Sequence, residues 1–173
     1  MDTITTPQLS DIQIRNQLLP GDLGYIAHVH GDLYAKECGY GLDFEAYVLQ
    51  GLKDFALEYD ATKDKVWICE HNHRIIGFLV AQHRGTDVVQ FRYFIFLPQY
   101  RGIGLGKKLM EQFLDFMRQQ GYNNAYLWTT EEQHAAIALY TRYGFKLSEQ
   151  KPSSATFGKP VVEQRYNLSL NQQ

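Results

Sequence analysis

The chain has 173 residues, which fits one domain, and its 45% hydrophobic and 21% charged residues are ordinary for a globular protein. The formal net charge of −2 gives no basic field that would recruit nucleic acid or an anionic membrane. No run approaches the ~18–20 apolar residues of a membrane span, and the N-terminus lacks the pattern of a secretory signal. We therefore expect a cytoplasmic protein with neither a membrane nor a nucleic-acid partner.

Cysteine and histidine spacing gives no metal-site pattern. Cys38 and Cys69 belong to no CxxC pair and have no histidine at ligand spacing, so we expect two free thiols and no metal. His71 and His73 flank Asn72 in a predicted hairpin turn, a position typical of solvated residues.

The first half of the chain predicts one strand, two helices and a three-stranded meander. We expect residues 1–10 to form a loosely attached tail and residues 11–173 to form a single domain. Apolar periodicity predicts a strand at 11–17, a helix from Asp22 to Gly39, a helix from Asp43 to about Tyr59, and strands at 65–70, 75–82 and 88–97. The connections between the last three strands are too short for crossovers, so these strands are antiparallel.

The second half alternates helices and strands. A helix follows a glycine-rich turn and ends near Gln120, and the remaining segments predict a strand at 124–129, a helix at 131–143, a strand after Gly144, a loop at 152–160 and a strand at 161–170. The order is βααβββαβαββ. It predicts an α/β (α+β) chain with a mostly antiparallel sheet and one crossover unit around the glycine turn.

The glycine turn, residues 101–106 (RGIGLG), carries the clearest chemical signal. Glycine tolerates positive φ and lets a ligand approach the backbone, and a helix N-terminus presents unpaired N–H groups with partial positive charge. With Arg101, Lys107 and Lys108 beside it, the turn predicts a cradle for phosphate. The spacing matches neither GxxxxGK[ST] nor GxGxxG, and the turn follows an antiparallel meander rather than an early parallel βαβ unit.

The turn instead resembles the signature Q/R-x-x-G-x-G/A of the GNAT superfamily of N-acetyltransferases. Residues 136–145 (AIALYTRYGF) are similar to the second hallmark of that superfamily, AxxLYxxxGF. Residues 30–37, 44–46 and 157–158 further resemble the acetyltransferase domain fused to MarR-type regulators, here in stand-alone form. The resemblance implies a mixed, mostly antiparallel sheet of about seven strands flanked by about four helices.

The resemblance also implies a site for acetyl-CoA. The main chain of one strand would pair with the pantetheine arm, the signature N–H groups would hold the pyrophosphate, and Gln133 stands where many relatives carry an asparagine that contacts the cofactor. Tyr140 would donate a proton to the departing thiolate. The implied cofactor-binding residues are Phe94, Ile95, Phe96, Arg101, Gly102, Ile103, Gly104, Leu105, Gly106, Lys107 and Gln133.

The acceptor side is less determined by the sequence. An amine with a pKa near ~10 must lose a proton before it attacks, so a base or a water chain is expected. Some relatives place a carboxylate where this chain has Trp128. The remaining candidates are Glu37, which we favour as the catalytic carboxylate, together with His30, Tyr34 and Glu70. We expect the acceptor to be bound by His30, Tyr34, Glu70 and Trp128. An aromatic entrance is predicted from Tyr34, Tyr40, Phe44 and Tyr47.

The leading interpretation is acetyl-CoA-dependent acetylation of a primary amine by direct attack in a ternary complex. The alternative is a non-catalytic acyl-CoA sensor on the same fold, since fold alone does not fix function. A small amine, an amino acid, a polyamine or a peptide N-terminus stays open as acceptor. Both a monomer and a homodimer are compatible with the sequence.

Overall fold

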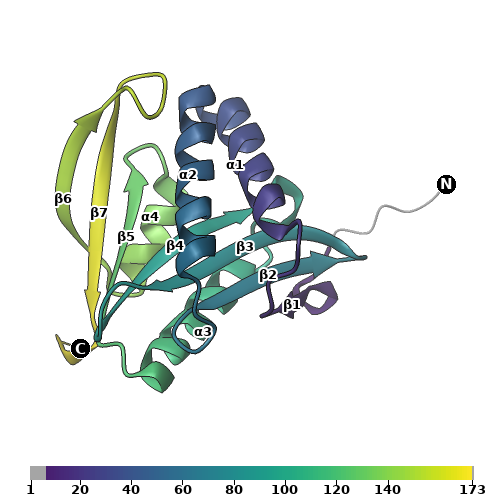
Figure 1. Ribbon diagram of the computed structural model, residues 1–173, viewed down its shortest axis with the longest axis vertical. Coiled ribbons are helices and arrows are strands. Elements are labelled where there is room, and N and C mark those ends of the chain that lie inside the picture. Colours follow the sequence, from purple (N-terminus) through teal and green to yellow (C-terminus); the bar gives the residue numbers. More distant parts are fainter. Residues whose placement is uncertain (1–6, 173) are drawn as a thin grey trace.

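The computed structural model describes residues 7–172 and contains seven strands and four helices within that range (Figure 1). In chain order they are β1 (Gln13–Arg15), α1 (Asp22–Cys38), α2 (Leu42–Glu58), β2 (Lys65–His71), β3 (Arg74–His83), β4 (Val88–Phe96), α3 (Leu105–Gln120), β5 (Asn124–Thr130), α4 (His134–Arg142), β6 (Lys146–Ser153) and β7 (Val161–Ser169). Short 3-10 turns occupy Leu9–Asp11, Pro98–Tyr100 and Leu170–Gln172. The predicted order of elements is confirmed.

All seven strands form one mixed sheet in the order β1-β2-β3-β4-β5-β7-β6. Only the β4–β5 pair among these strands is parallel, and α3 supplies the crossover between its two members. Every other neighbouring pair is antiparallel, including the meander β2-β3-β4. The predicted mixed, mostly antiparallel sheet is therefore confirmed.

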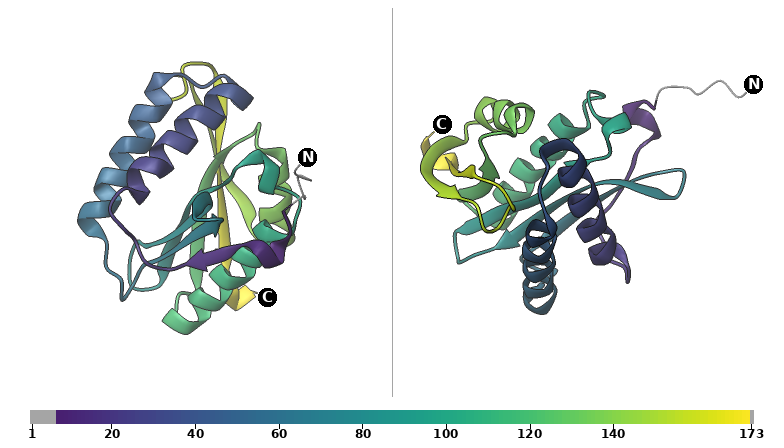
Figure 2. Two further views of the ribbon diagram at one scale, coloured as in Figure 1. Left: turned by 90° about the vertical axis from the view of Figure 1, so that its right-hand side faces the viewer. Right: turned by 90° about the horizontal axis from the view of Figure 1, so that it is seen from above.

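Helices cover both faces of the sheet, with α1 and α2 on one side and α3 and α4 on the other (Figure 2). The strand β2 shows why its sequence is continuously apolar. Trp67 and Cys69 pack toward α3, whereas Val66 and Ile68 pack toward α2. A strand with both faces covered cannot alternate with polar residues.

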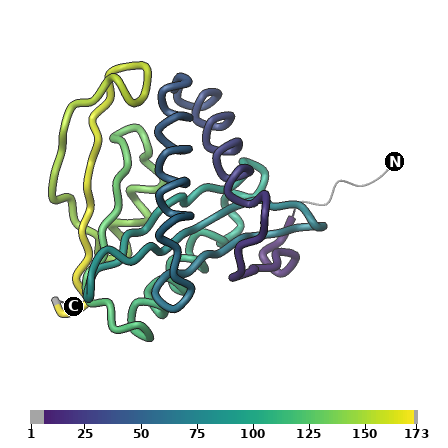
Figure 3. The backbone as a smooth tube through the Cα atoms, in the orientation of Figure 1, coloured from purple at the N-terminus to yellow at the C-terminus, as the bar shows by residue number. Residues whose placement is uncertain are grey.

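The strands β4 and β5 separate after a short region of contact. They pair only at three positions, from Val88 opposite Asn124 to Gln90 opposite Tyr126. Figure 3 shows the two strands starting together near the C-terminus and then running apart. From Phe91 to Phe96, β4 pairs with β3 alone, so one of its edges has no neighbouring strand.

A β-bulge in β4 changes which face its side chains occupy. The register with β3 shifts between Phe78 and Val80, and Tyr93 has a φ of 54°, in the left-handed region that few non-glycine residues adopt. Before the bulge Phe91 packs on the α3 side. Beyond it, Ile95 packs on the α2 side, although it lies an even number of positions, four, after Phe91. A regular strand would keep both on one face.

Three predicted elements have bounds that are wrong by two residues or more. The strand expected at 11–17 covers only β1, Gln13–Arg15, and Asp11 instead ends a 3-10 turn. The helix expected from residue 131 begins at His134, because the Glu131 N–H first donates to the Val162 carbonyl of β7. The strand β6 extends through Pro152 into the expected loop, which is possible because β6 is an edge strand.

The N-terminal tail is described only in part. Its residues 1–6 lie outside the described range, and Leu9, which we expected in a loose tail, packs against the core on the α3 side. None of the helices between residues 7 and 172 has the length and apolar character needed to cross a bilayer.

Burial predicts that alanine substitutions at two leucines lower the free energy of unfolding by very different amounts. Leu109 on α3 is 0% exposed and Leu57 on α2 is 77% exposed. Leu109→Ala should lower the free energy of unfolding by about 2–5 kcal/mol, because it opens a core cavity. The matched control Leu57→Ala should change it by less than about 0.5 kcal/mol. Urea denaturation measures both, and equal effects would contradict the packing described here.

Candidate active site

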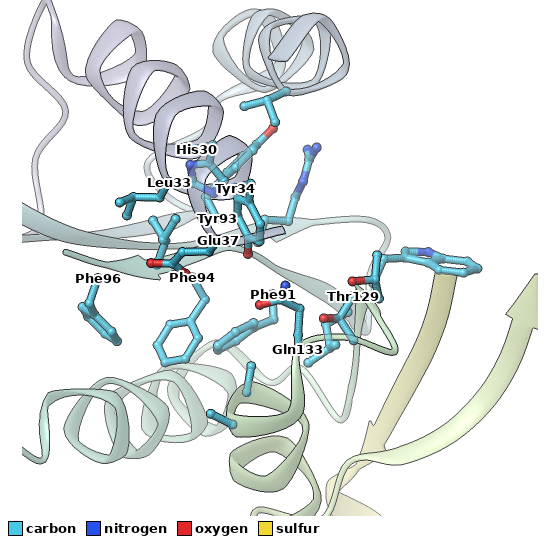
Figure 4. Close-up of a pocket in the computed structure, with 18 of the residues that line it drawn as sticks. His30, Leu33, Tyr34, Glu37, Phe91, Tyr93, Phe94, Phe96, Thr129 and Gln133 are labelled. Carbon is cyan, nitrogen blue, oxygen red and sulfur yellow. The ribbon is translucent and has the colours of Figure 1, made fainter. Parts of the chain in front are cut away.

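The opening between β4 and β5 holds a cavity of about 390 Å³ that passes from one face of the sheet to the other. Side chains from both helical layers line it (Figure 4), and the figure shows Phe94 and Phe96 across β4 from His30 and Tyr34. Of the residues predicted for the site, the cavity is lined by His30, Tyr34, Glu37, Phe94, Ile95, Phe96, Arg101, Gly102, Gly106, Trp128, Gln133 and Tyr140.

The glycine turn enters α3 through two glycines in the left-handed region, Gly102 with φ 76° and Gly104 with φ 89°. The first hydrogen bond of α3 joins the Lys108 N–H to the Gly104 carbonyl. The N–H groups of the three residues between them, 105–107, thus have no acceptor within the helix. The turn therefore has the free N–H groups that the predicted phosphate cradle requires.

Three other residues of the predicted cofactor site pack in the core or pair on the surface of α3. The Leu105 side chain is buried in the core, and Ile103 packs against the same core. Lys107 reaches Glu111 at 3.8 Å on the surface of α3. These three residues and Gly104 do not line the cavity, so any contact of theirs with a ligand would lie outside it.

The α3 side of the cavity is narrow and aromatic. A Cβ on Gly106 would lie in ordinary contact with Phe94 and Phe96, at 3.5 and 3.6 Å. The Phe96 ring also lies across Gly77 of β3, where any Cβ would collide with it. Tyr140 faces the same space from α4, and burial raises the pKa of its hydroxyl above the ordinary value. Tyr140 therefore keeps its proton at neutral pH.

The α2 side is the predicted aromatic entrance, and the structure confirms that its four rings gather at the cavity. Tyr34 and Tyr40 stack with centroids 5.5 Å apart, and Phe44 meets both edge-on. Tyr47 continues the group along α2 at 53% exposure. An acceptor would enter between apolar walls.

His30 is buried at the base of this entrance. Its Nδ1 donates to the Ile26 carbonyl at 2.8 Å, which leaves Nε2 as the basic nitrogen of the neutral ring. Its ring also packs against Tyr34 and Tyr93. Burial lowers the pKa of His30 to about 4. The ring is therefore neutral at physiological pH and a weak base.

Glu37 joins the end of α1 to the glycine turn across the cavity. Its Oε1 lies 3.0 Å from Arg101 Nη1, and Arg101 Nε donates to the Phe96 carbonyl at 3.0 Å. Nearby, Gln133 Nε2 donates to Cys38 Sγ at 3.3 Å and links α4 to the same end of α1. The carboxylate we favoured as a base is thus held in an ion pair.

Glu70 does not join the group. It lies on β2 and accepts from Arg15 at 2.9 Å, and Arg15 also binds Asp22 at the start of α1. It does not line the cavity. This ion-pair cluster holds β1, β2 and α1 together, so both of its carboxylates serve to join these elements.

Among the cavity residues that the sequence analysis did not predict are Arg92, Tyr93 and Glu163. The bulge places Arg92 and Tyr93 side by side. Their position could not be predicted, because no residue type indicates a bulge in the sequence. Glu163 belongs to β7, opposite Thr130 of β5. A weak signal did exist for Arg92, since it is the only charged residue in the strand VVQFRYFIF.

Both cysteines are reduced, with Cys69 buried and Cys38 half-buried. Within the part of the chain that the structure describes, no three His, Cys, Asp or Glu residues gather as a metal site would require. His71 Nδ1 instead meets the Tyr100 hydroxyl at 2.9 Å.

The site thus combines a parallel strand pair that separates after three positions with a helix that begins at a glycine turn. The model of the acetyltransferase (GNAT) family matches residues 32–145, so the chain belongs to that family. The N-acetyltransferase YjgM of Escherichia coli, itself uncharacterised, is 35% identical over 83 residues, which are 46% of this chain and 50% of YjgM. The chain spans about half the length of the curated relatives it matches.

Solved structures share the fold at low sequence identity. A GNAT acetyltransferase of Staphylococcus aureus superimposes with a TM-score of 0.74 at 18% identity, over 92% of this chain and 99% of the other. Spermidine N-acetyltransferase of Vibrio cholerae, in complex with CoA and spermine, gives 0.68 at 18% identity over 94% and 97%.

The buried His30 predicts a specific dependence of stability on pH. In the unfolded chain the imidazole of residue 30 is protonated below pH 6.5, whereas in the folded chain it is protonated only below about pH 4. Stability is therefore full above pH 6.5 and falls by about 1.4 kcal/mol per pH unit as the pH drops toward 4. Urea denaturation at pH 7, 6 and 5 should show a shallower slope for His30→Phe. The control His28→Phe, an exposed site on the same helix, should keep the wild-type slope, and an unchanged slope in His30→Phe would refute the assignment.

Proposed function

We propose that the protein is an acetyl-CoA-dependent N-acetyltransferase that acetylates a primary amine by direct attack in a ternary complex. The observation that carries the proposal is the continuous cavity between β4 and β5. It joins an anion cradle on the α3 side to an aromatic entrance on the α2 side. Two reactants can therefore meet from opposite faces of the sheet, as direct transfer requires.

The residues on the α3 side fit acetyl-CoA. The free N–H groups at 105–107, with Arg101 and Lys108 beside them, suit the pyrophosphate. The unpaired edge of β4 from Phe91 to Phe96 suits the amides of the pantetheine arm. When bound, acetyl-CoA supplies the acetyl group as an activated thioester.

The chemistry asks for three proton movements. The ammonium form of the amine first loses one proton; the neutral nitrogen then forms the amide C–N bond while the thioester C–S bond breaks, and it loses a second proton while the leaving sulfur gains one. Tyr140 holds a proton at Oη in the cavity and is the proposed donor to that sulfur. Glu37 is the proposed carboxylate for the amine proton, acting through water, with Arg101 fixing its position.

Other properties belong to the same proposal. The Vibrio cholerae enzyme named above is a spermidine N-acetyltransferase, and amines as a class are the acceptors we propose here. We also retain as proposals a cytoplasmic location, a single domain at 11–173, and a kinship with the acetyltransferase domain fused to MarR-type regulators.

A charge introduced at Gly104 tests the anion cradle. Asparagine and aspartate tolerate the left-handed region better than other residues and have nearly the same shape. Gly104→Asp should weaken CoA binding at least tenfold relative to Gly104→Asn, because only the aspartate repels pyrophosphate. Calorimetry with CoA measures both variants. Equal affinities in two folded variants would place the pyrophosphate elsewhere.

Removal of the Tyr140 hydroxyl tests the proton donor. Tyr140→Phe should lower kcat by about 10²–10⁴-fold with little change in CoA affinity. The matched control is Tyr143→Phe, which loses a hydroxyl that donates to Glu111 outside the cavity and should keep wild-type kcat. Thiol release from acetyl-CoA with a panel of amines provides the assay. Tight CoA binding without release for any amine would favour the acyl-CoA sensor.

A further inference from the structure

Arg92 is a cation at the cavity wall that the proposed chemistry leaves unused. Its Nη1 donates to Gln82 Oε1 at 2.6 Å, and the buried Gln82 in turn donates to Glu58 at 3.2 Å. Its guanidinium lies 4.7 Å from the centroid of the Tyr93 ring. A neutral amide and an aromatic face hold the side chain, rather than an opposite charge.

The other charged residues of the cavity have partners. Arg101 is paired with Glu37 at 3.0 Å, and Glu163 lies 3.9 Å from Lys151. Within residues 7–172, no carboxylate oxygen lies within 4.0 Å of the Arg92 guanidinium. A half-buried charge without a counter-charge is unfavourable, so an anionic ligand would satisfy it.

The Tyr93 hydroxyl is a second hydrogen-bond donor close to the Arg92 guanidinium. The Tyr93 hydroxyl is buried and finds no hydrogen-bond partner in the part of the chain that the structure describes. Its oxygen and Arg92 Nη2 both lie 2.7 Å from the place where a Cβ on Gly51 of α2 would stand. Two donors therefore converge where the fold supplies no acceptor. The Tyr93 oxygen is covered, whereas Arg92 is a half-buried lining residue of the cavity.

We propose that the acceptor is an amine with a carboxylate close to its nitrogen, as in an α-amino acid, and that Arg92 binds this carboxylate. The inference rests on the proposed function and names its substrate class. A guanidinium fork matches a carboxylate in shape and charge. The side chain of the amino acid would lie against the apolar walls formed by Tyr47 and Trp128.

A polyamine fits the same charges less well. Glu163 is the carboxylate that a second ammonium group would seek, and Lys151 already stands beside it and over the Trp128 ring at 4.6 Å. The unpaired Arg92 would repel that ammonium group. Arg92 is thus a specificity-determining residue of the acceptor site.

The test compares amino acids with amines that lack only the carboxylate. Suitable pairs are L-phenylalanine with phenethylamine and L-leucine with isopentylamine, with spermidine as a third class. The wild-type kcat/KM should favour the amino acid of a pair by about 10–100-fold, the range expected for a charge-assisted hydrogen bond. In Arg92→Gln that ratio should fall toward one, mainly through the KM of the amino acid.

Arg165→Gln provides the matched control. Arg165 also stacks on a tyrosine, Tyr126 at 4.2 Å, but it lies outside the cavity, so the variant should keep the wild-type ratio. A preference for the simple amines or for spermidine, or an unchanged ratio in Arg92→Gln, would overturn the inference while acetyl transfer itself continues.

Binding measurements separate this failure from failure of the proposed function. If no amine is acetylated, calorimetry of the same amino acids with the CoA-saturated protein still tests Arg92. Amino-acid binding that Arg92→Gln abolishes and Arg165→Gln keeps would support the site. No binding of any amino acid to the wild type would refute it. CoA binding by Arg92→Gln checks that this variant is folded.

Discussion

The parallel pairing of β4 with β5 stops after three positions, and the rest of the site depends on that separation. An uninterrupted sheet would divide the two helical layers completely. Because the strands part, one cavity reaches both layers, and the backbone edge of β4 beyond Gln90 faces it without a partner strand. The bulge at Tyr93 lies on this same unpaired part of β4, and because of it the residues before and after the bulge alternate between the two faces of the sheet in opposite phase.

The two ends of the cavity are chemically different. On the α3 side, backbone N–H groups and cations meet a helix N-terminus, which suits a highly charged ligand. On the α2 side, aromatic rings and a neutral imidazole surround a small number of fixed charges. The low polarity there strengthens each charge interaction. In the acceptor site that we propose, this applies to the guanidinium of Arg92, which has no carboxylate partner among residues 7–172.

Local sequence signals were sufficient for the order of the elements and the class of the sheet. The glycine turn, the residues from 136 to 145 and the aromatic periodicity of α2 are all contiguous in the chain. Long-range placement was not readable. The sequence favours Glu37 over Glu70 as the catalytic carboxylate but predicts no partner for either, and only folding directs Glu70 to Arg15 and Glu37 to Arg101. Arg92 lies beside a bulge, which shifts register by one residue and leaves no compositional mark.

Gly77 shows how far the demands of the cavity extend into the scaffold. It is paired with Phe96 in the register of β3 and β4, and the Phe96 ring occupies the volume that a side chain at Gly77 would need. Any larger residue there would displace that ring, which lines the cavity, although Gly77 itself does not line it. The β3 strand thus carries a constraint of shape on the active site, and a sequence survey of enzymes with an aromatic residue at the place of Phe96 should find glycine opposite it.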